Sequence, residues 1–411
     1  MKPTFRGTHQ ATHEQMKINR SKFTPTLAVL AIAGFAFLTT IAQAKPLKVY
    51  ILAGQSNMQG SAHKSTFAAM GDDQKTAPLL REILDKNGEP IVSHNAWITY
   101  KTQRNQIDTV LQSKVKVGYG FDDERIGPEY AFGITMDKAT KEPVLIIKAA
   151  WGGKSLAVDF RPPSSGPYLP SAKEKQNSNT PKKEEVGHYY REMMSFVKAT
   201  LKDTESIRKV VPSYDPKQGY EIGGFVWFQG WNDMCNRHHI EQYTSNMIHF
   251  ISDVRKELKV PTMPFIVGVM GVYGTDPESR KFDKGLPTTA FRKAQFAAVE
   301  QYDGKVKPRY RGNVIAVDSG PYYELELSDL YWKRRMTSNW KQQVKQGKMT
   351  PKKMQQECTR YGFGDGKLTA KEQMTWDKGA SNAEYHYLGS GKTFIRFGKA
   401  LAEAMLKMNK K

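Results

Sequence analysis

Residues 49–58 read Val-Tyr-Ile-Leu-Ala-Gly-Gln-Ser-Asn-Met, and this stretch decides the fold. Its first five residues are apolar, which is typical of a buried β-strand. Gly54 ends the apolar run, so Ser56 is expected at a strand-to-helix turn. Open α/β sheets bind their ligands beside the carboxyl ends of the strands. The stretch therefore predicts an α/β fold with Ser56 at the functional site.

A serine hydroxyl is a weak nucleophile, and it needs a nearby base and hydrogen-bond donors for the developing oxyanion. The stretch differs from the Gly-x-Ser-x-Gly elbow of α/β-hydrolases, because Met58 stands where the second glycine would be. A strand followed by Gly-x-Ser also occurs as an ordinary turn. The role of Ser56 therefore depends on the rest of the chain.

Apolar runs that predict further strands lie at 144–149, 224–228, 265–270 and 313–317. Amphipathic helices are expected between them and after them, most clearly over residues 240–258 and 390–407. This alternation predicts a parallel sheet that is covered by helices on both faces. Residues 155–185 and 320–385 interrupt the alternation, and their polar composition predicts two long loop insertions.

The first 44 residues have the pattern of a secretory signal peptide. Basic residues precede the apolar run 27–41, which ends in Ala-Gln-Ala at residues 42–44. We expect cleavage after Ala44, a single domain over residues 45–411, and a secreted or periplasmic protein. The alternative is an uncleaved anchor, which would tie the protein to a membrane.

The chain carries 62 Lys and Arg against 41 Asp and Glu, a net charge of +21. Without residues 1–44, 57 basic and 40 acidic residues remain, and the net charge is +17. Such a charge favours polyanionic partners, among them acidic polysaccharides. The basic residues are dispersed and no nucleic-acid motif is present, so we expect no nucleic-acid partner. Cys235 and Cys358 have no zinc-like spacing, and whether they form a disulfide is left open.

Three further stretches carry the base or the hydrogen-bond donors that a nucleophilic serine needs. Residues 224–233 end in Gly-Trp-Asn-Asp, where the Asn232 amide could bind an oxyanion or cap the next helix. Residues 146–155 run into Gly152 and Gly153, which could donate a backbone N–H or turn the chain. His386 precedes the last helix, and it is either a catalytic base or a histidine packed among aromatic side chains.

Taken together, the block Gly-Gln-Ser-Asn-Met at 54–58, the glycine pair at 152–153, the block Gln-Gly-Trp-Asn-Asp at 229–233 and His386 resemble the ordered blocks of the SGNH-hydrolase superfamily. Within it, the chain is similar to the branch of sialate O-acetylesterases and acetylxylan esterases. Ile-Gly-Pro-Glu at 126–129 is a further element of this branch. The resemblance implies a three-layer α/β/α fold with a flavodoxin-like parallel sheet.

The resemblance also implies a carboxylic ester hydrolase that removes O-acetyl groups from carbohydrates and uses no metal and no other cofactor. Ser56 would be the nucleophile and His386 the base. The oxyanion would be bound by backbone N–H groups and one side chain, namely those of Ser56, Gly152 or Gly153, and Asn232. Three side chains would contact the substrate, namely Gln55, Gln229 and Trp231.

The chain departs from the family pattern at two places. The family usually carries Asp three residues before its histidine, where this chain has Ala383. Glu384 is the nearest carboxylate and is expected to orient His386, with Asp377 as the alternative. The branch also commonly has Gly-Glu-Ser where this chain has residues 230–232, Gly-Trp-Asn. Ala383 favours the alternative function, a non-catalytic carbohydrate-binding or surface protein that retains the fold.

Overall fold

The computed structural model describes residues 45–410 except 141, 178–179, 281–284 and 306–311. The expected signal peptide, residues 1–44, lies outside the described residues. A seven-stranded sheet has the order β4-β3-β6-β1-β7-β8-β9, and β2 pairs with β5 in a small second sheet. The strands are β1 Leu47–Gly54, β2 Ala62–His63, β3 Ala96–Arg104, β4 Ile107–Lys114, β5 Arg125–Ile126, β6 Val144–Ala150, β7 Tyr220–Phe228, β8 Phe265–Val269 and β9 Val314–Asp318.

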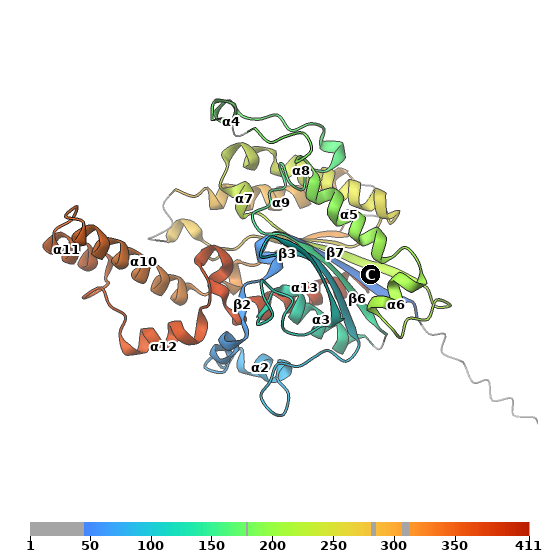
Figure 1. Ribbon diagram of the computed structural model, residues 1–411, viewed down its shortest axis with the longest axis horizontal. Helices are drawn as coiled ribbons and strands as arrows, with labels where there is room; N and C mark the ends of the chain where they lie inside the picture. Colours follow the sequence, from blue (N-terminus) through green and yellow to red (C-terminus); the bar gives the residue numbers. More distant parts are fainter. Residues whose placement is uncertain (1–44, 141, 178–179, 281–284, 306–311, 411) are drawn as a thin grey trace, which may run out of the picture. The chain divides into compact units, whose positions relative to one another are not determined.

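Helices lie on both faces of the large sheet, with α3 and α13 on one face and α5, α8 and α9 on the other (Figure 1). The α-helices are α1 Ser56–Gln59, α2 Ala77–Ile83, α3 Pro128–Ala139, α4 Ala172–Gln176, α5 His188–Thr200, α6 Thr204–Val210, α7 Trp231–Met234, α8 Arg237–Leu258, α9 Thr288–Lys305, α10 Leu325–Lys345, α11 Pro351–Tyr361, α12 Ala370–Gly379 and α13 Gly391–Asn409. The short 3-10 helices are η1 Lys64–Met70, η2 Pro163–Ser165, η3 Pro277–Ser279, η5 Gly320–Tyr322 and η6 Glu384–Gly389.

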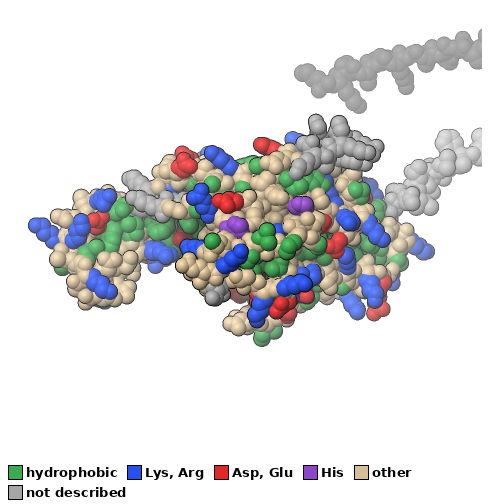
Figure 2. All heavy atoms as spheres, turned by 90° about the horizontal axis from the view of Figure 1, so that it is seen from above, with side chains coloured by type: hydrophobic (Ala, Val, Ile, Leu, Met, Phe, Trp, Pro, Cys, Tyr) green, Lys and Arg blue, Asp and Glu red, His purple; other side chains and the backbone are tan. Residues whose placement is uncertain are grey.

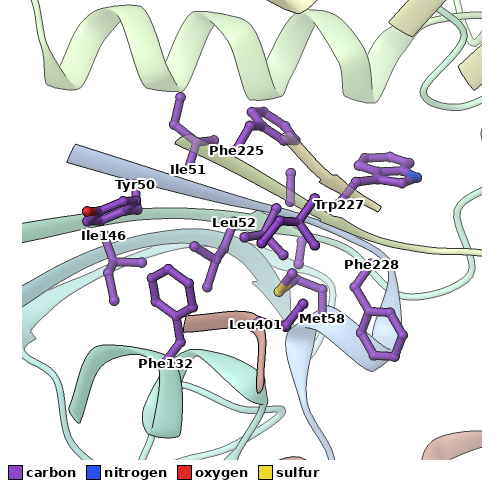
Figure 3. Close-up of a cluster of buried hydrophobic side chains, with 14 of the residues drawn as sticks. Tyr50, Ile51, Leu52, Met58, Phe132, Ile146, Phe225, Trp227, Phe228 and Leu401 are labelled. Atoms are coloured by element: carbon purple, nitrogen blue, oxygen red, sulfur yellow. The ribbon is translucent and has the colours of Figure 1, made fainter. Parts of the chain in front are cut away.

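The central strand β1 explains why this sheet is buried on both faces. It pairs in parallel with β6 and β7, with Ile51 opposite Ile147 and Phe225. Successive side chains of a strand point to opposite faces. Ile51 accordingly lies with Phe225 on one face, whereas Leu52 lies on the other, where the core also contains Phe132 (Figure 3). The predicted three-layer α/β/α fold with a mostly parallel sheet is confirmed.

The hairpin of β3 and β4 was not predicted. β4 pairs antiparallel with β3 at the edge of the sheet, and much of its surface is exposed. Polar and apolar residues therefore both occur along it, and the apolar run that identifies the central strands is missing. The turn residues Asn105 and Gln106 have φ values of 49° and 64°, as two-residue hairpin turns require. Gln106 stands where glycine is usual, which hides the turn in the sequence.

The expected loop over residues 320–385 was also a wrong prediction, because most of it is helical. Residues 325–379, named the helical arm below, contain α10, α11 and α12. Thr369 and Glu372 form a reciprocal capping box that starts α12, and the Thr350 side chain accepts a hydrogen bond from the Lys353 N–H at the start of α11. Lys, Gln and Met, which are frequent there, favour helices even where the surface is polar.

The other insertion, residues 155–185, is mostly irregular, as expected, and is organised by Arg161. This side chain is nearly buried and donates hydrogen bonds to the carbonyl oxygens of Gly166 at 2.8 Å and Ser165 at 3.0 Å. Cys235 is exposed, Cys358 is buried, and both are free thiols, so no disulfide joins them. No helix among the described residues is both long enough and apolar enough to cross a bilayer.

Candidate active site

Ser56 is the first residue of α1, directly after β1, as the sequence predicts. The turn requires glycine at position 54, because a Cβ there would lie 2.0 Å from the carbonyl oxygen of Phe228. The carboxyl ends of β1 and β7 therefore meet closely beside Ser56. As the first residue of a helix, Ser56 has an N–H without a partner inside that helix. This N–H is suited to bind an oxyanion.

Gln55 connects the ends of β1 and β7. Its Oε1 accepts hydrogen bonds from the Gly230 N–H at 2.9 Å and the Asn232 N–H at 3.4 Å. Its Nε2 donates to Asn232 Oδ1 at 3.2 Å and lies 3.5 Å from Ser56 Oγ. Because Gln55 is buried, this predicted substrate contact instead holds Asn232 beside Ser56.

Asn232 follows β7 and the glycine pair follows β6, the two strands that flank β1. Asn232 Nδ2 donates to the carbonyl oxygen of Gly153 at 2.7 Å, which leaves its second amide hydrogen for a ligand. A Cβ on Gly152 would lie 4.0 Å from Ser56 Cβ, so the backbone of Gly152 runs beside Ser56. Both glycines are exposed. The structure thus brings together the four residues expected to form the oxyanion hole.

His386 lies on η6, and hydrogen bonds tie this segment to the chain around Ser56. Asn57 Nδ2 donates to the carbonyl oxygen of Tyr385 at 3.1 Å, and Ser61 Oγ donates to that of His386 at 2.9 Å. Tyr387, next in the chain, has a φ of 52°, which is uncommon for a residue with a side chain. Its hydroxyl accepts a hydrogen bond from the Gly271 N–H at 2.9 Å. Contacts outside the segment therefore fix its conformation.

Surrounding side chains keep the His386 imidazole neutral. Nδ1 lies 3.0 Å from Asn382 Oδ1, and the ring packs against Phe121 and Tyr385 with centroids at 5.2 and 4.4 Å. Burial lowers the pKa of His386 to about 4, because the charged form loses its hydration. A neutral imidazole can accept a proton. In the described part of the chain Ser56 and His386 share no hydrogen bond, and such catalytic contacts often form only when substrate binds.

The structure does not place either expected carboxylate at His386. Glu384 Oε1 lies 3.8 Å from Nη1 of Arg335 on α10, and Asp377 accepts a hydrogen bond from Gln373 on α12 at 2.7 Å. The side-chain oxygen of Asn382 lies at Nδ1 of His386 instead. A carboxylate is the usual orienting group, so no pattern in the sequence indicated this amide four residues before the histidine.

The two other predicted substrate contacts have different surroundings. Gln229 is buried, and its Nε2 donates to the carbonyl oxygen of Lys154 at 3.0 Å and to Asp233. It thus supports the loop after Gly153. Trp231 is only half-buried, and its ring packs against Tyr385 with centroids 5.3 Å apart. Of the three residues, only Gln55 and Trp231 lie against other site residues, and only Trp231 presents surface to a ligand.

A buried ion pair below α1 was not predicted. Lys148 Nζ donates to Glu129 Oε2 and to the carbonyl oxygens of Gln59 and Tyr119, each at 2.7 Å. Both charged side chains are fully buried. Burial lowers the pKa of Lys148 to about 8 and raises that of Glu129. Since Gln59 is the last residue of α1, the pair holds the helix that begins with Ser56.

Comparison with known proteins agrees with this geometry. A family model for carbohydrate esterases, the sialic acid-specific acetylesterases, matches residues 46–305. A probable carbohydrate esterase of Arabidopsis thaliana is 35% identical over 66 residues, which are 16% of this chain and 22% of that relative. The match therefore spans less than a quarter of the relative's length.

Solved structures that match this chain include three at low sequence identity. An Arabidopsis thaliana protein is 17% identical with a TM-score of 0.42, over 88% of this chain and 98% of that chain. A carbohydrate acetylesterase from Xanthomonas citri is 14% identical with a TM-score of 0.36, over 66% and 49% of the two chains. NanS is 13% identical with a TM-score of 0.37, over 67% and 78%.

Proposed function

Because the chain belongs to the family of sialic acid-specific acetylesterases, which are carbohydrate esterases, we propose that it removes O-acetyl groups from carbohydrates with Ser56 as nucleophile. The observation that carries this proposal is the meeting of four groups at one edge of the sheet. Ser56 follows β1, Gly152 follows β6 and Asn232 follows β7, and the segment with His386 is bonded to the chain beside Ser56.

In the proposed reaction Ser56 Oγ attacks the acetyl carbonyl carbon, and His386 Nε2 takes the hydroxyl proton. The oxyanion is bound by the N–H groups of Ser56 and Gly152 and by Asn232 Nδ2. His386 then gives its proton to the sugar oxygen as the C–O bond breaks, which leaves an acetyl-enzyme. Water attacks this ester with His386 again as base, and acetate leaves.

Asn382 determines which imidazole nitrogen carries the proton. Its side-chain oxygen accepts from Nδ1–H, so that the lone pair of Nε2 is available to Ser56. An amide orients the ring as a carboxylate does, but it carries no charge to stabilise the imidazolium that forms during the reaction. We therefore propose a Ser-His-Asn site in place of the expected site with Glu384.

We also propose that the protein is exported and that residues 45–411 form the mature enzyme. The proposal is supported by the basic, apolar and Ala-Gln-Ala segments of residues 1–44. N-terminal sequencing of the protein from the natural host is expected to begin at Lys45. An intact apolar segment 27–41 recovered with membranes would show a tethered enzyme.

The test of the catalytic proposal is acetate release from p-nitrophenyl acetate and from acetylated glycans. Ser56→Ala is expected to lower kcat by about 10³-fold or more, because the nucleophile is lost. Ser65→Ala, which removes a hydroxyl from an exposed serine nearby, is the matched control. If Ser56→Ala retains the wild-type kcat, the serine mechanism is wrong. A folded wild type that binds acetylated glycans without turnover would instead support the non-catalytic alternative.

A further inference from the structure

The helical arm lies beyond residues 46–305, which the family model matches, and the proposed reaction uses none of its side chains. Lys333 on α10 donates hydrogen bonds to both carboxylate oxygens of Glu372 on α12, at 3.0 and 2.8 Å. An apolar cluster of Trp340, Cys358 and Phe363 joins α10 to α11. The three helices of the arm are therefore fixed relative to one another.

Four side chains of the arm, Tyr331, Trp376, Arg334 and Arg335, combine aromatic rings with guanidinium groups and are named the arm platform. The ring centroids of Tyr331 and Trp376 are 6.3 Å apart, with the rings inclined by 31°. Arg334 lies 4.5 Å from the centroid of Trp376, and Arg335 lies 5.8 Å from that of Tyr331. Both rings are half-buried and both arginines are exposed.

The arm platform borders the segment that carries the catalytic base. Arg335 Nη1 lies 3.8 Å from Oε1 of Glu384, the first residue of η6. His386 is two residues further along the same short segment. The ring of Tyr385, between them in the chain, packs against Trp231 at the end of β7. The ion pair of Arg335 therefore links the arm platform to the segment whose next ring, that of Tyr385, packs on the wall of the candidate active site.

The charge of the arm favours an anionic ligand. Residues 325–379 contain 12 Lys and Arg against six Asp and Glu. Arg334 and Lys371 are exposed, and neither forms an ion pair with another described residue. Figure 2 shows Lys and Arg side chains spread over the arm with few acidic ones between them. A positive surface beside a site raises the local concentration of anionic substrates.

We propose that the arm platform is a subsite for an anionic sugar unit of a polysaccharide that is deacetylated at Ser56. The apolar C–H face of the sugar would pack on Trp376 and Tyr331, since aromatic side chains offer large apolar surfaces. Its carboxylate or sulfate group would bind Arg334, because a guanidinium pairs with such groups through two parallel hydrogen bonds. The inference rests on the proposed function, which supplies the reaction at the neighbouring site.

The first experiment measures binding without catalysis. Calorimetry is carried out on the full chain with three unacetylated polymers: polygalacturonate, dextran sulfate and neutral dextran. Arg334→Glu is expected to raise the Kd for a charged polymer about tenfold or more, because one charge-assisted contact is lost. Trp376→Ala is expected to raise it about tenfold, because the packing surface for the sugar is lost. Lys345→Glu, on the exposed end of α10 away from the platform, is the control with the same change of charge and is expected to have little effect. The two charged polymers distinguish carboxylate from sulfate.

The second experiment measures catalysis as a ratio. The kcat/KM on acetylated polygalacturonate, divided by that on p-nitrophenyl acetate, is expected to fall about tenfold in Arg334→Glu, through a higher KM. Wild-type binding in both platform variants, or an equal loss in Lys345→Glu, would overturn the subsite. Tight binding of neutral dextran would overturn its anionic character. If the polymers bind at the platform and no ester is hydrolysed, the proposed function fails and the binding site stands.

Discussion

Asn382 takes a position at which serine esterases usually carry a carboxylate, and the protonation of His386 follows from this difference. The imidazole is largely buried and faces an uncharged oxygen, so its pKa falls to about 4. The base must be neutral to accept the Ser56 proton. We therefore expect kcat/KM of the wild type to remain high down to about pH 5 and to fall only below that.

Asn382→Asp tests this account directly. A carboxylate beside Nδ1 stabilises the imidazolium and raises the pKa of His386, by about one to three units for a close opposite charge. The acid limb of the kcat/KM profile is therefore expected to move to higher pH. Gln373→Glu, an amide-to-acid change on the exposed surface of α12, is the control. An unchanged pH profile in Asn382→Asp would show that Asn382 does not contact the His386 imidazole.

Asn232→Ala is expected to lower kcat by about 10²–10³-fold with little change in KM, because an oxyanion donor acts mainly in the transition state. Asn236→Ala is the comparison, since the Asn236 side chain caps α8 and makes no contact with Ser56. That variant should lower Tm and leave kcat nearly unchanged. If Asn232→Ala behaves in the same way, Asn232 stabilises structure and does not bind the oxyanion.

The residues predicted from sequence are those whose role is visible in their local pattern. Ser56, Asn232 and Gly152 each follow an apolar strand, and parallel strands bring their carboxyl ends to one edge. Asn382 and Lys148 could not be found in this way. Asn382 precedes η6 and meets His386 inside it, and Lys148 on β6 meets Glu129 on α3 between the sheet and that helix, so neither contact leaves a periodic signal.

Helix α1 has only four residues, too few to be stable without tertiary contacts. Its end is held by Lys148, which binds the carbonyl oxygen of Gln59, and by Gln59 Nε2, which donates to Thr102 Oγ1 at 2.8 Å. The position of Ser56 therefore depends on a buried charge and on β3, an edge-region strand that the sequence did not reveal.

Lys148→Met is expected to destabilise the protein by about 3–5 kcal/mol, because it leaves Glu129 buried without its partner. The double variant with Glu129→Gln should recover part of this loss, since no uncompensated charge then remains. Urea unfolding measures the free energy, and kcat on p-nitrophenyl acetate reports whether α1 has moved. Equal stability of Lys148→Met and wild type would show that the pair is not buried as described.

Whole helices also differ in whether a local sequence pattern predicts them. Helices α8 and α13 were predicted because an apolar stripe on each faces the sheet. The helical arm was missed because α10, α11 and α12 pack on one another and on the short helices η1 and η6, and much of their surface is polar. In this arm the capping residues indicate where helices begin, whereas apolar periodicity does not mark the helices.

The sequence contains two cysteines, and the surroundings of their thiols predict different reactivity. Cys235 is exposed, whereas Cys358 lies inside the arm cluster with Trp340 and Phe363. An aromatic disulfide reagent should modify one thiol in the native protein and the second only after unfolding. A reducing agent should leave Tm unchanged. Absence of any reactive thiol in the unfolded, unreduced protein would show that a disulfide forms.

The distance along the chain between Ser56 and His386 has a practical consequence for work with this enzyme. The proposed nucleophile follows the first strand of the large sheet, and the proposed base follows the last strand and the arm. A fragment that stops before η6 can contain the whole sheet and still lack the base. Acetate release is thus a stricter assay of correct assembly than helix content or solubility. Cleaved or incompletely refolded protein can be soluble and helical and still release no acetate.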